Sequence, residues 1–230
     1  MLKKYKKIQT NQTSKNYLKR YTLEPKEIYS KLEELYPKAY TELQYRNIFE
    51  LVIAVVLSAQ TTDVAVNKVT PKLFSKYPTP FALSQADVKD VEEIISSIGL
   101  YKTKAKNIIN LAKVLVSNYN GNVPNVFEEL IKLPGVGRKS ANVILSEGFN
   151  IPRIAVDTHV LRVSNRLGFA DSQNPVIVEK ELMEKFLPSQ WHQLHLRLIL
   201  FGRYFCKSKP KKCHECPFQS ICRYLKHEVK

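Results

Sequence analysis

Four cysteines gather near the end of the 230-residue chain. They are the only cysteines in the sequence, and they follow the spacing C-x6-C-x2-C-x5-C: Cys206, Cys213, Cys216 and Cys222. Four thiolates this close together can surround one metal centre, either a [4Fe–4S] cluster or a zinc ion, or can pair as two disulfides. Structural zinc usually takes two short cysteine pairs and only one is present, so the spacing slightly favours a cluster. A chain that stays inside the cell disfavours the disulfides.

The first loop between these cysteines is strongly basic. Four of its six residues are lysines: Lys207, Lys209, Lys211 and Lys212. Held by thiolates at both ends, the loop would present a rigid positive surface to a phosphate backbone. The alternative is that these lysines only offset the negative charge of the thiolates and their metal centre.

A second motif, Leu-Pro-Gly-Val-Gly-Arg-Lys, occupies residues 133–139 between two apolar helical runs. Its proline and glycines predict a tight hairpin in which both Gly135 and Gly137 can take positive φ angles. Backbone N–H groups would then point outward beside the start of the next helix and form a seat for phosphate. The motif is too short for a Walker loop, so a hairpin that grips DNA is favoured over nucleotide binding. An ordinary turn between helices is the alternative, which the adjacent Arg138 and Lys139 disfavour.

Lys139 and Asp157 are the candidate catalytic residues, the first as a nucleophile and the second as a carboxylate that assists it. Lys139 would lie in the first turn of the helix after the hairpin, where the helix dipole disfavours a protonated amine. A neutral amine can attack an electrophilic sugar carbon and form a Schiff base, although pairing with phosphate is the competing interpretation. Asp157 can cap the helix running through residues 161–167, and it can also assist proton transfer and stabilise developing positive charge. His159 is either a phosphate contact or a local structural histidine.

Composition and charge fit a folded protein that binds a polyanion. The chain has 36 basic and 21 acidic residues, a net charge of +15, and residues 1–20 hold seven Lys or Arg and no acidic residue. A content of 44% hydrophobic and 25% charged residues argues against disorder. No apolar run approaches the roughly 20 residues that cross a bilayer, and no apolar segment follows the basic start. We therefore expect no membrane span and an intracellular, cytoplasmic or nucleoid-associated protein. The alternative to polyanion binding by residues 1–20 is that they serve solubility or form a flexible tail.

Helical periodicity predicts an all-α fold, since no alternating strand pattern appears. Residues 47–59 are apolar nearly all round, which predicts a helix buried in the centre of a bundle, with a buried strand as the alternative. Helices are expected to start at caps formed by Ser84 with Asp87, by Asn125, by Asn174 and by Ser189, and to end at Gly99 and at Asn120–Gly121.

These motifs together resemble the endonuclease III family, DNA glycosylases with AP lyase activity in the helix-hairpin-helix superfamily. The resemblance rests on the cysteine spacing and on residues 57–63, 98–101, 133–139 and 156–160. It implies two all-α domains with the active site in the cleft between them, and a [4Fe–4S] cluster in place of zinc. The implied domains are a six-helix barrel of residues 41–149, with its helix-hairpin-helix at about 126–147, a cluster domain of residues 23–40 and 150–230, and a basic extension of residues 1–22.

The resemblance also implies roles for individual residues. Lys139 would be the nucleophile and Asp157 its catalytic carboxylate, while Gln60 and Leu100 would fill the hole left by an extruded nucleotide. Three hairpin carbonyls would hold a monovalent cation near DNA: those of Ile131, Leu133 and Val136. Other DNA contacts are expected from Gly135, Gly137, Arg138, His159 and the loop lysines Lys207, Lys209, Lys211 and Lys212.

The implied reaction removes oxidised or ring-saturated pyrimidines such as thymine glycol from duplex DNA and cleaves the abasic site on its 3′ side by β-elimination. A monomer is expected to act on DNA containing such damage or abasic sites. The nearest rival is the adenine glycosylase branch, which usually lacks the hairpin lysine and carries a catalytic glutamate in the segment matching 56–61, where no acid occurs. A thymine-mismatch glycosylase would also replace Lys139. A non-catalytic DNA-binding module and a redox sensor are disfavoured by the pairing of Lys139 with Asp157.

Overall fold

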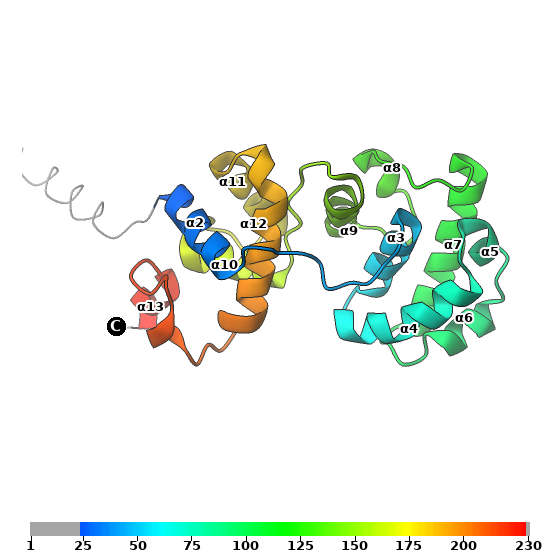
Figure 1. The fold of residues 1–230 in the computed structure, drawn as a ribbon, viewed down its shortest axis with the longest axis horizontal. Coiled ribbons are helices and arrows are strands. Elements are labelled where there is room, and N and C mark those ends of the chain that lie inside the picture. Colours follow the sequence, from blue (N-terminus) through cyan, green and yellow to red (C-terminus); the bar gives the residue numbers. More distant parts are fainter. Residues whose placement is uncertain (1–23, 229–230) are drawn as a thin grey trace, which may run out of the picture. The chain divides into compact units, whose positions relative to one another are not determined.

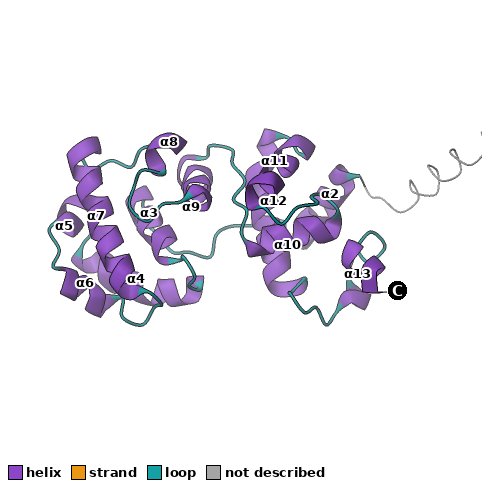
Figure 2. Cartoon of the chain, turned by 180° about the vertical axis from the view of Figure 1, so that it is seen from behind, coloured by secondary structure: helices purple, strands orange, loops and turns teal. Residues whose placement is uncertain are grey.

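The computed structural model describes residues 24–228, and within that range the regular structure is entirely helical (Figures 1 and 2). The predicted all-α fold is confirmed, whereas the basic extension of residues 1–22 lies outside the described residues. The α-helices are α2 (Pro25–Leu35), α3 (Ile48–Leu57), α4 (Asp63–Lys76), α5 (Pro80–Ser84), α6 (Val88–Ile94), α7 (Tyr101–Tyr119), α8 (Phe127–Leu130), α9 (Arg138–Val143), α10 (Thr158–Leu167), α11 (Pro175–Lys185), α12 (Pro188–Leu200) and α13 (Arg223–Glu228). Two π-helical segments, η1 (Ile144–Gly148) and η2 (Phe201–Phe205), extend α9 and α12, and η3 (Cys213–Glu215) is a 3₁₀ turn.

The chain divides into two compact units. The hairpin unit consists of residues 40–155 and 188–196, and the cysteine unit consists of the described residues within 1–39, 156–187 and 197–230. Among the described helices, none combines the length and the apolar character that crossing a membrane requires.

Helix α3 is the centre of the hairpin unit. Residues 51–54 and Leu57 have no exposed surface, and α3 packs against α4, α7, α9 and η1. Asn47 caps the helix by accepting a hydrogen bond from the N–H of Glu50. The predicted buried helix is therefore confirmed and the alternative of a strand is wrong. Burial on all sides explains why α3 is apolar all round.

The predicted helix between Ser84 and Gly99 is wrong at both ends. Ser84 is the last residue of α5, and α6 is capped by Asp87 and ends at Ile94. Ile95 and Ile98 are nevertheless buried. The apolar period thus continues through the turn after α6, because these side chains pack in the core although the backbone there is no longer helical.

Of the other predicted helix ends, two are confirmed and two are wrong. Asn120 has a φ of 50° and ends α7, and Asn174 caps α11, both as predicted. Asn125 is not a cap, since Val126 precedes α8. Ser189 lies inside the first turn of α12, which begins at Pro188.

The cysteine unit has an aromatic core and an ion pair between a buried arginine and an exposed glutamate. The rings of Phe201 and Phe218 meet edge to face with centroids 5.3 Å apart. Arg197, which is 2% exposed, donates to Glu33 at 2.7 Å and to the carbonyl of Tyr36. These bonds connect α12 to α2.

Candidate functional site

The hairpin between α8 and α9 has the predicted tight turn. The N–H of Val136 donates to the carbonyl of Leu133 at 3.0 Å, and Gly135 has a φ of 82°. Gly137 does not share that conformation, because its φ is −96° and its ψ is 179°. The prediction of a positive φ at Gly137 is therefore wrong: Gly137 is the extended residue from which α9 starts.

The outer surface of the hairpin is open. Gly137 supplies no side-chain cap, so the N–H groups of Lys139 and Ser140 in the first turn of α9 are available to an outside acceptor. Lys139 is exposed, and its amine has no ion pair or hydrogen bond among the described residues. The guanidinium carbon of Arg138 lies over the ring of Phe127, 5.3 Å from the ring centroid. The hairpin therefore presents backbone donors, a fixed guanidinium and an unpaired amine together.

The three hairpin carbonyls predicted to hold a cation belong to residues in different surroundings. Leu133 is 2% exposed and Val136 is 6% exposed, whereas Ile131 is 44% exposed. The carbonyl of Leu133 already accepts the hydrogen bond that closes the turn. A cation site here stays a prediction.

Asn142 connects α9 to the segment that leads to Asp157. Its side chain is 1% exposed and donates to the carbonyl of Ile154 at 3.0 Å. Sequence reasoning missed this residue, although a polar side chain on the apolar side of the helix after the hairpin was the available signal. A buried amide in this position has to be hydrogen-bonded, so it fixes the path of the extended segment.

Asp157 caps α10, as predicted. One carboxylate oxygen accepts from the N–H groups of His159 and Val160, at 2.9 and 2.8 Å. The other oxygen lies 3.0 Å from Nδ1 of His159. The carboxylate is thus held in one orientation while 16% of the side chain stays exposed. His159 has the local structural role that was one of its two interpretations, and its phosphate contact stays a prediction.

Gln60 and Leu100 share an uncommon backbone conformation. Their φ angles are 53° and 58°, in the left-handed region that few residues other than glycine adopt. Both side chains are exposed, Leu100 by 61%. Strained residues of this kind concentrate at binding sites, and Leu100 leaves most of its side chain exposed.

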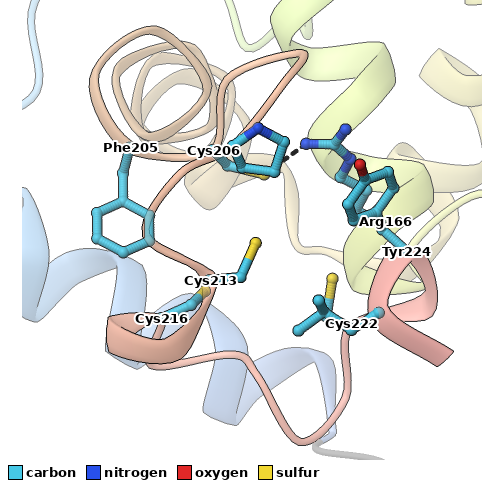
Figure 3. A pocket seen from close by; sticks show the side chains of 9 residues that line it. Arg166, Phe205, Cys206, Cys213, Cys216, Cys222 and Tyr224 are labelled. Atoms are coloured by element: carbon cyan, nitrogen blue, oxygen red, sulfur yellow. Dashed lines mark hydrogen bonds between the residues drawn. The ribbon is translucent and has the colours of Figure 1, made fainter. Parts of the chain in front are cut away.

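The four cysteines line one pocket in the cysteine unit (Figure 3). They come from the end of η2, from η3 and its end, and from the turn before α13, and the sulfurs of Cys213 and Cys222 point into the pocket. Apart from Arg166 and Tyr224, the remaining lining is apolar: Phe205, Pro210 and Leu225. A donor set made of sulfur alone suits iron–sulfur clusters or zinc and does not suit magnesium or calcium.

Three of the four cysteines are half-buried and Cys222 is buried. Among the described residues, no group of three or more His, Cys, Asp or Glu side chains converges closely enough to hold one metal ion. Burial, with the other three cysteines adding to it, raises the pKa of Cys216 to about 11. Binding of a positively charged centre would offset this effect at Cys216.

Two arginines of α10 hold the loop that follows the first cysteine. Arg162 donates to the carbonyls of Gly202 and Cys206, at 2.8 and 3.0 Å. Arg166 donates to Sγ of Cys206 at 3.2 Å and to the carbonyl of Lys207 at 2.7 Å. Sequence reasoning missed both arginines, whose signal was their spacing of four residues on the helix that follows Asp157.

The lysines of this loop are all exposed. Lys212 lies 3.6 Å from Glu215, whereas Lys207, Lys209 and Lys211 have no ion pair among the described residues. The loop is anchored through its backbone, so these three charges remain available to a polyanion.

The predicted site residues fall into two groups. The hairpin unit carries Gln60, Leu100, the hairpin and Lys139, and the cysteine unit carries Asp157, His159, the cysteines and the loop lysines. In the hairpin unit, the bond of Asn142 to Ile154 fixes the backbone after the hairpin. In the cysteine unit, the cap of α10 fixes Asp157, and the two arginines fix the loop after Cys206.

Comparison with known proteins gives consistent results. The profile of HhH-GPD superfamily base excision DNA repair proteins matches residues 53–188. Endonuclease III of Bacillus subtilis (strain 168) is 50% identical over 194 residues, which cover 84% of this chain and 89% of that protein. Endonuclease III of Escherichia coli (strain K12) is 46% identical over 199 residues, covering 86% of this chain and 94% of that protein.

A solved structure agrees with the sequence matches. A trapped endonuclease III–DNA covalent intermediate, an estranged-adenine complex, superposes with a TM-score of 0.86 at 47% identity. The match covers 91% of this chain and all of that one.

Proposed function

The chain belongs to the HhH-GPD superfamily of base excision DNA repair proteins, and within it to the endonuclease III family, and we propose that it removes oxidised or ring-saturated pyrimidines from duplex DNA. Membership of this family makes it a DNA glycosylase with AP lyase activity. The observation that carries the proposal is the exposed, unpaired amine of Lys139 in the first turn of α9, beside the open N–H groups of the hairpin.

Lys139 is the proposed nucleophile. Once it has lost its proton, its amine attacks C1′ of the damaged nucleotide, the glycosidic bond breaks, and the electron pair leaves with the base, which takes up a proton. The amine nitrogen, having lost a proton, then forms a double bond to C1′, the C1′–O4′ bond breaks, and O4′ takes up a proton. The resulting protonated Schiff base acidifies the C2′ proton. Loss of that proton expels the 3′ phosphate by β-elimination and cleaves the strand.

Asp157 is the proposed carboxylate partner of this reaction. Its orientation is supported by the two N–H groups of α10 that bind one of its oxygens. A carboxylate held in this way can stabilise positive charge on the sugar and take up a proton. Its cap bonds are already formed, so the carboxylate is held in one orientation before the reaction begins.

DNA binding is supported by the hairpin and the basic loop. Backbone N–H groups at the start of α9 suit a phosphate, and the exposed loop lysines would release counterions from DNA. Gln60 and Leu100 are proposed to enter the duplex where the damaged nucleotide leaves it, one as a polar wedge and the other as an apolar wedge. Damaged pyrimidines that stack poorly cost less to extrude.

The four cysteines are the proposed ligands of a [4Fe–4S] cluster. The pocket lined by all four cysteines supports a metal centre with sulfur ligands, and membership of the endonuclease III family favours the cluster over zinc. The cluster would supply a redox-active centre, and its bonds to Cys206 and Cys213 would hold the Lys207–Lys212 loop at both ends. No step of base removal depends on it.

Borohydride trapping on a duplex with one thymine glycol tests the proposal. Borohydride delivers hydride to the Schiff base carbon and leaves a stable amine that joins protein to DNA. We expect an adduct with the wild type, none with Lys139→Ala, and wild-type yield with Lys132→Ala, which removes another exposed lysine of the same region. A lesion substrate is needed because many amines react with a preformed abasic site.

The possible outcomes separate the functions. Base release without an adduct would indicate a glycosylase that lacks lyase chemistry. DNA binding with neither base release nor adduct would leave a binding module and overturn the proposal.

A further inference from the structure

Lys104 has a buried amine in the hairpin unit. It lies in the first turn of α7 and is 4% exposed. Its Nζ donates to Oγ1 of Thr61 at 2.6 Å, and no carboxylate pairs with it among the described residues. Burial lowers the pKa of Lys104, and the positive end of α7 adds to the cost of its charge. A lysine in so unfavourable a place calls for an explanation other than packing.

The hydrogen bond of Lys104 joins two strained turns. Thr61 directly follows Gln60, and the N–H of Lys104 donates to the carbonyl of Leu100 at 3.0 Å. Gln60 and Leu100 are two of the four residues other than glycine with positive φ in the described chain. Such conformations persist only where surrounding contacts hold them. One side chain therefore connects the segments that carry both of these residues.

We propose that Lys104 is a positioning residue that fastens the turn of Gln60 to the turn of Leu100, so that both side chains meet DNA as one pre-arranged pair. The inference rests on the proposed function, in which these two residues fill the hole left by the extruded nucleotide. Holding both turns before binding avoids the entropy loss of ordering them on DNA. Lys104 acts through the turns, since a side chain 4% exposed does not reach a phosphate.

Variants on both sides of the bond test this role. Lys104→Met keeps the apolar stem and removes the amine, and Thr61→Val removes the hydroxyl that accepts its bond. Thr61→Ser keeps that hydroxyl and should restore wild-type behaviour. Lys106→Met is the matched control, because it removes an exposed lysine from the same helix. Thr61→Val decides the result if Lys104→Met fails to fold.

The readout compares duplex and single-stranded DNA that carry the same abasic site. Borohydride trapping rates are measured on both, with the rate of Lys139→Ala subtracted as background. Only the duplex has a hole to fill, so a positioning role affects the duplex alone. We expect Lys104→Met and Thr61→Val to lower the duplex rate about tenfold, as loss of one hydrogen bond to a charged group does, and to leave the single-strand rate unchanged.

The outcomes are distinguishable from failure of the proposed function. A wild type that forms no adduct on either DNA refutes the proposed function and this inference with it. A wild type that reacts, together with Thr61→Val at the wild-type duplex rate, refutes this inference alone. Equal losses on duplex and single strand in Thr61→Val would show a purely structural bond and would also overturn it.

Discussion

Substitution of Gly135 by alanine should destabilise the hairpin by a predictable amount. The φ of 82° places the new Cβ in the left-handed region, at a cost of about 1–2 kcal/mol. That Cβ would also lie 2.9 Å from Cγ1 of Val56 and 3.3 Å from Cβ of Asn107. Val56 is 2% exposed within α3, so it has little room to move, and overpacking adds roughly 1–3 kcal/mol. The sum is a loss of about 2–5 kcal/mol.

Gly137→Ala is the matched control in the same turn. Its φ of −96° suits any residue, and a Cβ there meets nothing within 4 Å. Stability should therefore change by less than about 0.5 kcal/mol. Thermal unfolding followed by circular dichroism measures both variants, and at about 2–4 °C per kcal/mol Gly135→Ala should melt at least 4 °C or so below the wild type.

A second measurement isolates the contact with Val56. In a double-mutant cycle of Gly135→Ala with Val56→Ala, the smaller side chain should recover part of the loss, with a coupling of about 0.5–3 kcal/mol. Equal melting temperatures for the two glycine variants would refute the reasoning, because the structure gives them opposite surroundings. Zero coupling would leave the backbone contribution and the contact with Asn107.

Three other predictions follow from single side chains. Asn142→Leu leaves the buried carbonyl of Ile154 without its donor and should lower the free energy of unfolding by about 1–3 kcal/mol in a thermal melt. Lys209→Gln and Lys211→Gln should each reduce the slope of log binding constant against log salt by about 1, measured by fluorescence titration of a duplex. Burial and a hydrogen bond to a carboxylate raise the pKa of Tyr77 to about 12, so its contribution to stability is complete below the usual value of 10.0 and is lost as pH rises toward 12. Melting temperature measured against pH should therefore fall less steeply between pH 10.0 and 12 in Tyr77→Phe than in the wild type. Identical pH profiles for the two proteins would contradict this prediction.

Features determined by local chemistry could be predicted from the sequence. The apolar run of α3, the left-handed Asn120 that ends α7 and the cap formed by Asp157 each depend on residues within a few positions of one another. The hairpin was predictable for the same reason, since proline and glycine restrict or free the backbone where they stand. Its details were not. A glycine permits a positive φ without requiring one, and only the start of α9 determines that Gly137 is extended.

Features that depend on distant partners were not predictable. Lys104 is a lysine in a helix with other lysines, and nothing in the sequence indicates that its amine meets Thr61, 43 residues away. Arg162 and Arg166 look like the polar face of α10 until the loop after Cys206 packs against them. A charged residue is expected at the surface from its type alone, so burial of this kind is visible only in the folded chain.

Helix α10 would connect a metal centre at the four cysteines to the proposed chemistry without any contact between that centre and the substrate. Asp157 caps the start of this helix, and Arg162, five residues later, binds the carbonyls of Gly202 and Cys206. A Cβ at Gly202 would lie 2.9 Å from Cβ of His159, so η2 packs closely on the turn that orients the carboxylate. The segment that supplies the first thiol and the turn that supplies the carboxylate therefore support each other. Because a helix of 10 residues moves as a unit, a centre that fixes Cys206 also limits the positions open to Asp157.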